Sequence, residues 1–176
     1  EGHERFSETR FKKYLKELFV PMAEYFISKG MYVVMRPPGV CPHAGDTEDN
    51  RYLGIELGDS YQEFLLKVWD IVSQNAVVKN NPGIMFELAN IKGTDGKYGG
   101  DGDACFINMQ KYFQAIVDKI RGNACNNIIW VPGLGWQSQY SGYKDHRIEG
   151  ENIGFAVHCY PGWYGSDAEQ DSGEGN

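Results

Sequence analysis

The sequence has 176 residues, of which 41% are hydrophobic and 14% aromatic, and its formal net charge is -7. A chain of this length forms one domain or part of a larger one, and it can bury a substantial core. The negative charge argues against nucleic acid and anionic membranes as partners. No apolar run approaches the ~20 residues of a membrane-spanning helix. The charged start of the chain is not a signal peptide, so we expect any export signal to lie outside it.

The four cysteines carry little information. Cys105 and Cys125 flank a predicted helix and should lie roughly 25 Å apart, whereas a disulfide needs Cα atoms within about 7 Å. No cysteine spacing resembles a zinc site, and Cys41-Pro42-His43 is an isolated near-pair. A calcium loop is conceivable in the aspartate-rich segment 95–103, but its spacing does not match an EF-hand. We therefore predict no metal and no cofactor.

Three segments have the apolar spacing of amphipathic helices. The first begins after Ser7, a good N-cap, and Pro21 either kinks it or opens a second helix that runs to Ser28. The next covers about 60–72, with Ser60 as its cap, and the last covers about 104–121.

Four short apolar runs predict buried strands, at 31–35, 84–89, 127–132 and 153–158. The run 84–89 lies between the turn signal Asn81-Pro82-Gly83 and a glycine-rich loop. Because helices alternate with strands, we predict an α/β fold with a parallel sheet. This domain should cover residues 1–165, and the acidic tail 166–176 should be loose.

Polar and aromatic residues stand at or just past the carboxyl ends of the predicted strands. Arg36 follows the first, Asn90 the second, Trp136 the third, and His158 and Tyr160 the fourth. Ligands of parallel α/β folds bind at this edge, so these side chains are expected to converge on one site. Each residue taken alone could simply cap its own strand. Their recurrence at every strand favours a shared site.

Several of these runs resemble glycoside hydrolase family 5, the cellulase-type (β/α)8 barrels. Phe86-Glu87-Leu88-Ala89-Asn90 resembles the strand that carries Asn-Glu-Pro in that family, and Ala156-Val157-His158-Cys159-Tyr160 resembles its His-x-Tyr strand. Residues 129–136 resemble the strand between these two, and residues 31–39 the preceding one. The resemblance implies the central part of a (β/α)8 barrel, with four strands as an incomplete half-barrel.

The resemblance also implies a retaining endo-β-glucanase that acts on β-1,4-linked glucan or a related plant polysaccharide. Retention needs an acid/base and a nucleophile, two carboxyl groups about 5 Å apart. The family's acid/base directly follows the asparagine that aligns with Asn90, but Ile91 stands there, and the nucleophile strand lies beyond the fourth strand. We therefore assign no catalytic residue. Glu87 should lie about 13 Å deeper than position 91 and pair with a core partner.

Aromatic residues carry the expectation of a sugar ligand, because the flat face of a pyranose ring stacks on such side chains. Tyr140 and Tyr143 follow the third strand with Trp136, and Tyr164 follows the fourth with Trp163; packing under long loops is the alternative for each. The expected substrate-binding residues are Arg36, Asn90, Trp136, His158, Tyr160 and Trp163.

Two function classes stay open, a family 5 type hydrolase and a non-catalytic carbohydrate-binding relative. A dinucleotide site at Gly133-Leu134-Gly135 is a distant third, because the third glycine is missing. Ile91 indicates either a lost acid/base or residues missing at the Asn90-Ile91 junction. The glucan specificity predicts a secreted, cell-surface or periplasmic protein. Open sheet edges invite pairing, so a homodimer is expected.

Overall fold

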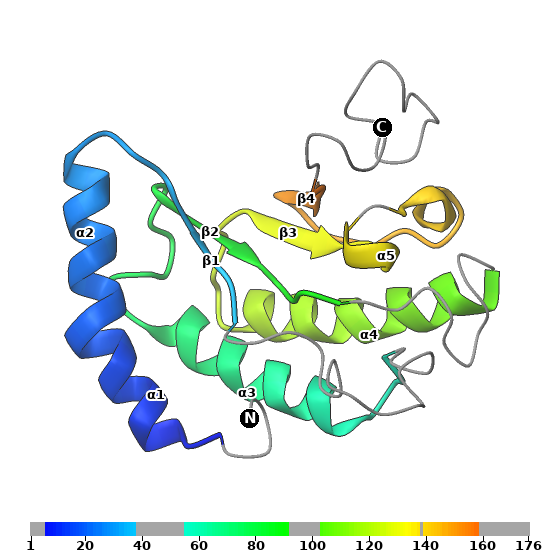
Figure 1. The fold of residues 1–176 in the computed structure, drawn as a ribbon, viewed down its shortest axis with the longest axis horizontal. Helices are drawn as coiled ribbons and strands as arrows, with labels where there is room; N and C mark the ends of the chain where they lie inside the picture. The colour runs from blue at the N-terminus through cyan, green and yellow to red at the C-terminus, as the bar shows by residue number, and fades with distance from the viewer. Residues whose placement is uncertain (1–5, 38–54, 92–102, 138, 159–176) are drawn as a thin grey trace.

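Four parallel strands form one sheet in the order β1-β2-β3-β4 (Figure 1). The computed structural model describes residues 6–37, 55–91, 103–137 and 139–158. The strands are β1 (Val33–Met35), β2 (Ile84–Glu87), β3 (Ile129–Pro132) and β4 (Ile153–Ala156). The predicted α/β fold built of parallel β/α units is confirmed, and each strand is shorter than its apolar run. The tail 166–176 lies outside the described residues.

The first helix passes through Pro21 without ending. It consists of α1 (Glu8–Tyr14), a π-helical turn η2 (Leu15–Phe19) and α2 (Val20–Ser28). In η2 the Val20 N–H donates to the Leu15 carbonyl, so the hydrogen-bond spacing widens just before the proline that lacks an N–H. Ser7 is the N-cap as predicted, because its hydroxyl accepts from the Arg10 N–H at 3.4 Å.

Two longer helices follow, α3 (Ser60–Gln74) and α4 (Asp103–Gly122). The prediction that Ser60 caps α3 is wrong: the cap is Asp59, whose Oδ1 accepts from the Gln62 N–H at 2.7 Å. Cys105 and Cys125 are free and buried, which confirms that they form no disulfide. None of the helices in the described part of the chain is long and apolar enough to cross a membrane.

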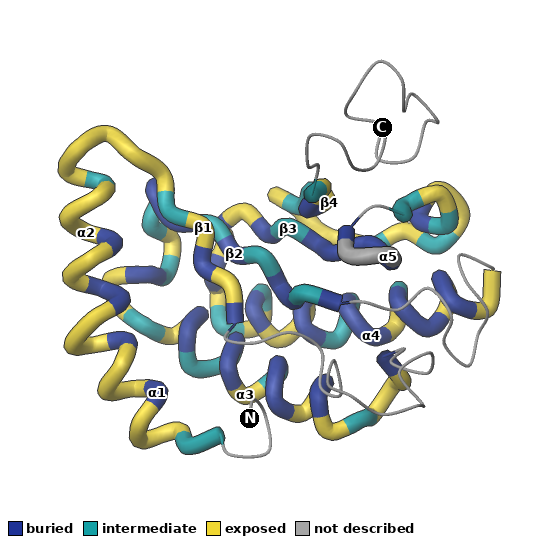
Figure 2. The backbone as a smooth tube through the Cα atoms, viewed as in Figure 1, coloured by how far each residue is buried: buried dark blue, intermediate teal, exposed yellow. Residues whose placement is uncertain are grey.

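The helices cover one face of the sheet, and their buried sides are turned toward it (Figure 2). Trp69 on α3 packs on Phe86 of β2 with ring centroids 5.0 Å apart. Its indole Nε1 also donates to the Leu88 carbonyl at 3.0 Å. On the opposite face Val34 is 48% exposed and Glu87 is half-buried. Alternation along the strands therefore separates a packed face from an open one.

The crossover from β3 to β4 contains a short helix α5 (Leu134–Gln137) and a 3-10 turn η4 (Ser141–Lys144). Tyr143 is buried here: its ring stacks on Phe155 at 5.0 Å and meets Phe106 edge-on at 5.2 Å. Its hydroxyl donates to the Pro132 carbonyl at 3.0 Å. Tyr140 also packs on Phe155. For these two tyrosines the structure favours packing over sugar stacking.

Asn127 joins the amino ends of the strands. Its buried amide donates to the carbonyls of Val78, Asn81 and Ile84 at 2.8–3.1 Å, and its Oδ1 accepts from the Asn80 N–H at 2.7 Å. One side chain thus satisfies three backbone groups of the loop that leads into β2 and one of the strand itself.

We predict that Asn127→Ala lowers the free energy of unfolding by about 3 kcal/mol, because buried backbone groups lose their partners. Urea denaturation followed by circular dichroism measures this change. The neighbouring exposed Asn126 is engaged through its backbone groups, so Asn126→Ala is the matched control and should cost under about 0.5 kcal/mol. Equal losses in the two variants would contradict the role of the Asn127 side chain.

Burial raises the pKa of the Tyr143 phenol well above its usual value, which is near 10. The unfolded chain ionises this group first, so the wild-type free energy of unfolding should fall as pH rises above about 10. Tyr143→Phe keeps the ring and should cost about 1 kcal/mol at neutral pH. The difference in the free energy of unfolding between wild type and Tyr143→Phe should then shrink between pH 9 and 11. A difference that stays constant with pH would refute this assignment.

The outer edge of β1 has no strand partner among the described residues. Val33 donates its N–H to Gly83 on the β2 side, so the backbone groups of Val34 face outward. The expected homodimer remains a prediction. A second copy would supply four further strands, which matches the eight of a closed barrel.

Sedimentation velocity at micromolar concentration should therefore show a dimer for the wild type. Val34→Pro removes the outward N–H and is tolerated on an edge strand, so it should shift the protein toward monomer without unfolding it. A wild-type protein that is monomeric under these conditions would exclude pairing through this edge.

Candidate functional site

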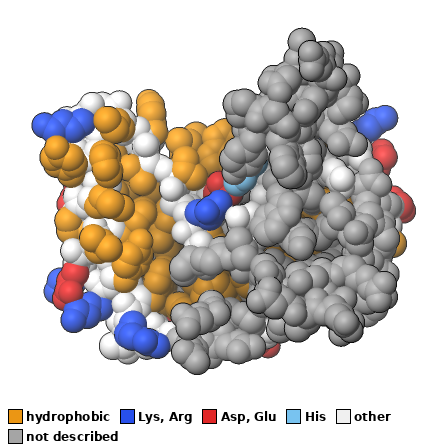
Figure 3. All heavy atoms as spheres, in the orientation of Figure 1, with side chains coloured by type: hydrophobic (Ala, Val, Ile, Leu, Met, Phe, Trp, Pro, Cys, Tyr) orange, Lys and Arg blue, Asp and Glu red, His pale blue; other side chains and the backbone are white. Residues whose placement is uncertain are grey.

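Three polar side chains, Glu87 of β2, Arg36 just past β1 and His158 just past β4, meet on the open face of the sheet. His158 Nε2 lies 3.1 Å from Glu87 Oε1, and Arg36 Nη1 lies 3.9 Å from the same oxygen. Figure 3 shows basic, acidic and histidine side chains gathered on this face beside hydrophobic surface. Two residues predicted from their strand ends, Arg36 and His158, thus converge on one carboxylate.

The register of the sheet produces this cluster. Met35 pairs with Phe86, so Arg36 and Glu87 come next on adjacent strands. Phe86 is fully buried against the helices, and the pleat therefore turns Glu87 to the other face. The Glu87 side chain is 12% exposed and that of Arg36 is 44% exposed. The carboxylate sits inside the cluster, and the guanidinium forms its outer part.

The prediction that Glu87 pairs with a core partner is wrong, because its partners are two of the predicted site residues. The expected separation of about 13 Å between Glu87 and position 91 holds only along a single strand. Strands of a barrel-type sheet are tilted and staggered against each other, so positions on different strands reach the same level. The long side chain of Arg36 and the ring of His158 cover the remaining distance.

Three buried side-chain oxygens belong to residues at or after the ends of β2 and β3. Among the described residues no donor is hydrogen-bonded to Glu87 Oε1, Asn90 Oδ1 or Gln137 Oε1. His158 Nε2 is within ion-pair distance of Glu87 but without the alignment of a hydrogen bond. Buried polar atoms in native proteins are normally paired. These three oxygens are themselves buried, so of the three residues only Glu87 and Asn90, which are half-buried as whole residues, offer surface to a ligand.

Gln137 is a site residue that the sequence analysis missed. Its side-chain Nε2 donates to the Ala89 carbonyl at 3.3 Å, and its backbone carbonyl accepts from the backbone N–H of His158 at 3.1 Å. It has a left-handed backbone with φ of 65° and is fully buried. The residue thus connects the end of β2 to His158. No pattern in the sequence marks it, because its role depends on the fold of the crossover.

The remaining predicted residues are placed as follows. Asn90 is half-buried just past β2, and Trp136 belongs to α5, which follows β3. Tyr160 and Trp163 lie outside the described residues, so their roles stay predictions. Ile91, at the expected acid/base position, is 1% exposed and belongs to the hydrophobic core.

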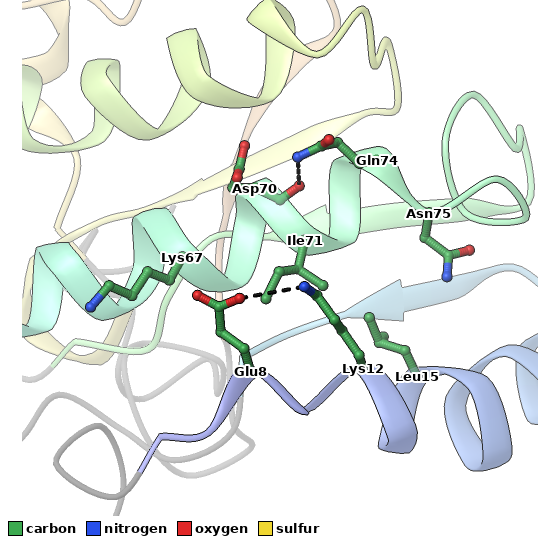
Figure 4. A pocket seen from close by; sticks show the side chains of 8 residues that line it. All are labelled: Glu8, Lys12, Leu15, Lys67, Asp70, Ile71, Gln74 and Asn75. Carbon is green, nitrogen blue, oxygen red and sulfur yellow. Dashed lines mark hydrogen bonds and ion pairs between the residues drawn. The ribbon is translucent and has the colours of Figure 1, made fainter. Parts of the chain in front are cut away.

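Two other clefts contain none of the predicted site residues. One of about 300 Å³ lies between α1 and α3 and is lined by Glu8, Lys12, Lys67 and Asp70 among others (Figure 4). Another, of about 350 Å³, is lined by asparagines at the amino ends of the strands. No group of three or more His, Cys, Asp or Glu side chains in the described part of the chain could hold a metal ion. The Cys41-Pro42-His43 near-pair lies outside the described residues.

Comparison with known proteins adds family information. The family model described as cellulase (glycosyl hydrolase family 5) matches residues 4–176. An endoglucanase of Halalkalibacter akibai is 26% identical over 160 residues, which cover 88% of this chain and 18% of that protein. The chain therefore spans less than a fifth of the length of this relative.

Two solved structures share the fold. The catalytic domain of alkaline cellulase K aligns with a TM-score of 0.57 at 23% identity, over 88% of this chain and 41% of that one. A thermostable, highly halotolerant GH5 cellulase from an Icelandic hot spring isolate aligns with a TM-score of 0.52 at 19% identity. This alignment covers 80% of this chain and 38% of that one. The chain thus spans about two fifths of each structure.

We predict unequal couplings within the charged cluster. A double-mutant cycle of Glu87→Gln with His158→Gln should give a coupling free energy of about 1 kcal/mol, because the pair is close and mostly buried. The cycle with Arg36→Gln should give under about 0.5 kcal/mol, because that pair is longer and more exposed. Urea denaturation of the single and double variants provides both values. A stronger coupling to Arg36 would contradict the geometry.

Proposed function

Because the chain belongs to glycosyl hydrolase family 5, we propose that it acts on β-1,4-linked glucan or a related plant polysaccharide at the carboxyl ends of its strands. The observation that supports this site is the convergence of Arg36 and His158 on Glu87. Family 5 proteins with this fold present the same edge of the sheet to their ligands.

The chemistry of the cluster suits sugar hydroxyl groups, which both donate and accept hydrogen bonds. The carboxylate of Glu87, whose side chain is 12% exposed, can accept hydrogen bonds from these hydroxyls. The exposed guanidinium of Arg36 donates to them. We place the remaining sugar contacts on Trp136, Tyr160 and Trp163, whose rings suit the flat face of glucose.

Cleavage is a separate requirement from binding. An endo-acting retaining mechanism needs a protonated acid and an ionised nucleophile on two carboxyl groups about 5 Å apart. Among the described residues Glu87 is the carboxylate that we find in this cluster, and an apolar residue occupies position 91. This observation favours the second candidate function, a carbohydrate-binding relative that holds glucan without cleaving it. Glucan binding is common to both candidates and is the conclusion that the geometry supports best.

A secreted, cell-surface or periplasmic location fits this proposal, because a protein encounters a polymeric plant glucan outside the cytoplasm. Net charge of -7 fits a neutral polysaccharide better than nucleic acid.

Affinity electrophoresis in gels that contain barley β-glucan tests the proposal. We expect the glucan to retard the wild-type protein, and Glu87→Gln and His158→Ala to weaken binding about tenfold, since each removes a charged partner in the site. Glu24→Gln makes the same chemical change on the exposed surface of α2 and should leave binding unchanged. Absence of retardation for the wild type would refute the proposed function.

A reducing-end assay on the same glucan separates the two candidates. Turnover that exceeds the blank and is lost in Glu87→Gln indicates a hydrolase that uses this cluster. Retardation without turnover indicates the binding relative.

A further inference from the structure

Trp130 lies on the open face of the sheet in the row that contains Glu87. In the register of the sheet Trp130 pairs with Glu87 on β2 and with Gly154 on β4. Its neighbours in β3, Ile129 and Val131, are fully buried against the helices, so the Trp130 side chain projects to the other side. The indole is half-buried there. The Trp130 side chain therefore lies on the open face of the sheet, beside the cluster of Arg36, Glu87 and His158.

Gly154 determines how the indole lies. A Cβ atom added to Gly154 would stand 2.4 Å from Cζ3 and 2.7 Å from Cε3 of Trp130. Real Cβ atoms do not approach so closely, so the six-membered ring of the indole rests directly on the backbone of β4. With any side chain at position 154 the ring would have to move. Because Gly154 has no side chain, the indole of Trp130 can lie flat along the sheet.

A carboxylate lies next to this surface. The Glu87 carboxylate, which meets His158, adjoins it on β2. Among the described residues the indole Nε1 has no acceptor, and no described helix covers this face. An aromatic ring with one side against the sheet and a carboxylate at its rim matches a β-linked glucose unit. All ring substituents of that sugar are equatorial, which leaves an apolar C–H face and a polar rim.

We propose that Trp130 is the platform on which one glucosyl unit of a β-1,4-glucan stacks, that Gly154 positions the indole for it, and that Glu87 accepts a hydrogen bond from a hydroxyl of the same unit. This inference rests on the proposed glucan binding and adds a binding residue and a positioning residue to that site.

Isothermal titration with cellohexaose tests the proposal on the full chain. Trp130→Ala should weaken binding about tenfold, the effect of about 1.4 kcal/mol expected for a lost ring contact. Trp130→Phe keeps a smaller ring and should lose about threefold. Gly154→Ala leaves the tryptophan in place but displaces its ring, and it should weaken binding as much as Trp130→Ala does.

Gly122→Ala is the matched control, since a Cβ there meets nothing within 4 Å and the backbone is compatible with alanine. It should bind cellohexaose as the wild type does. Thermal unfolding of each variant establishes that it is folded before titration. In addition, cellohexaose should change the tryptophan fluorescence of the wild type, and most of that change should disappear in Trp130→Phe.

The outcomes separate this inference from the function on which it rests. If the wild type binds cellohexaose, and folded Trp130→Ala and Gly154→Ala bind it equally well, Trp130 only covers the sheet and the platform is refuted while glucan binding stands. If the wild type does not bind, glucan binding itself fails. Loss in both variants with the Gly122→Ala control unchanged supports the platform.

Discussion

The packing of β2 against α3 is the interaction on which the site depends. Trp69 covers Phe86, and its indole N–H binds the Leu88 carbonyl just where the strand ends. With Phe86 fixed on the helical side, the alternation of the pleat leaves Glu87 only the open face. A one-residue slip of this strand would exchange the two and place a carboxylate in the core. The same contact that closes the core therefore directs the Glu87 carboxylate to the open face.

From this central strand the site extends in both directions across the sheet. Arg36 reaches Glu87 from β1, and His158 reaches it from beyond β4, with Gln137 holding the His158 backbone. The strand between them, β3, contributes a ring instead of a charge. Since Trp130 and Gly154 share a register with Glu87, the polar cluster and the aromatic surface are parts of one continuous face. Such a combination of hydrogen-bonding groups around a flat apolar patch is what a pyranose ring requires.

The sequence predicts the order of elements well, because apolar runs and helical spacing depend on local physics. The positions of Arg36 and His158 near the strand ends were also predictable, since each follows a strand whose end can be recognised. Glu87 and Gln137 were not. The position of Glu87 relative to other strands depends on tilt and stagger, which no single strand encodes. Gln137 depends on a left-handed turn in the crossover, and its neighbours give no signal for that conformation.

The conformation at position 91 likewise depends on the fold beyond the end of β2. β2 ends at Glu87. Beyond it Leu88 and Ala89 are both fully buried, so strict alternation has already ceased. Ile91 then lies in the hydrophobic core, where an ionised carboxylate would pay a large desolvation penalty. Placing a glutamate there would therefore demand a different path for the backbone after Asn90, whereas Glu87 and Trp130 are supplied by the strands themselves.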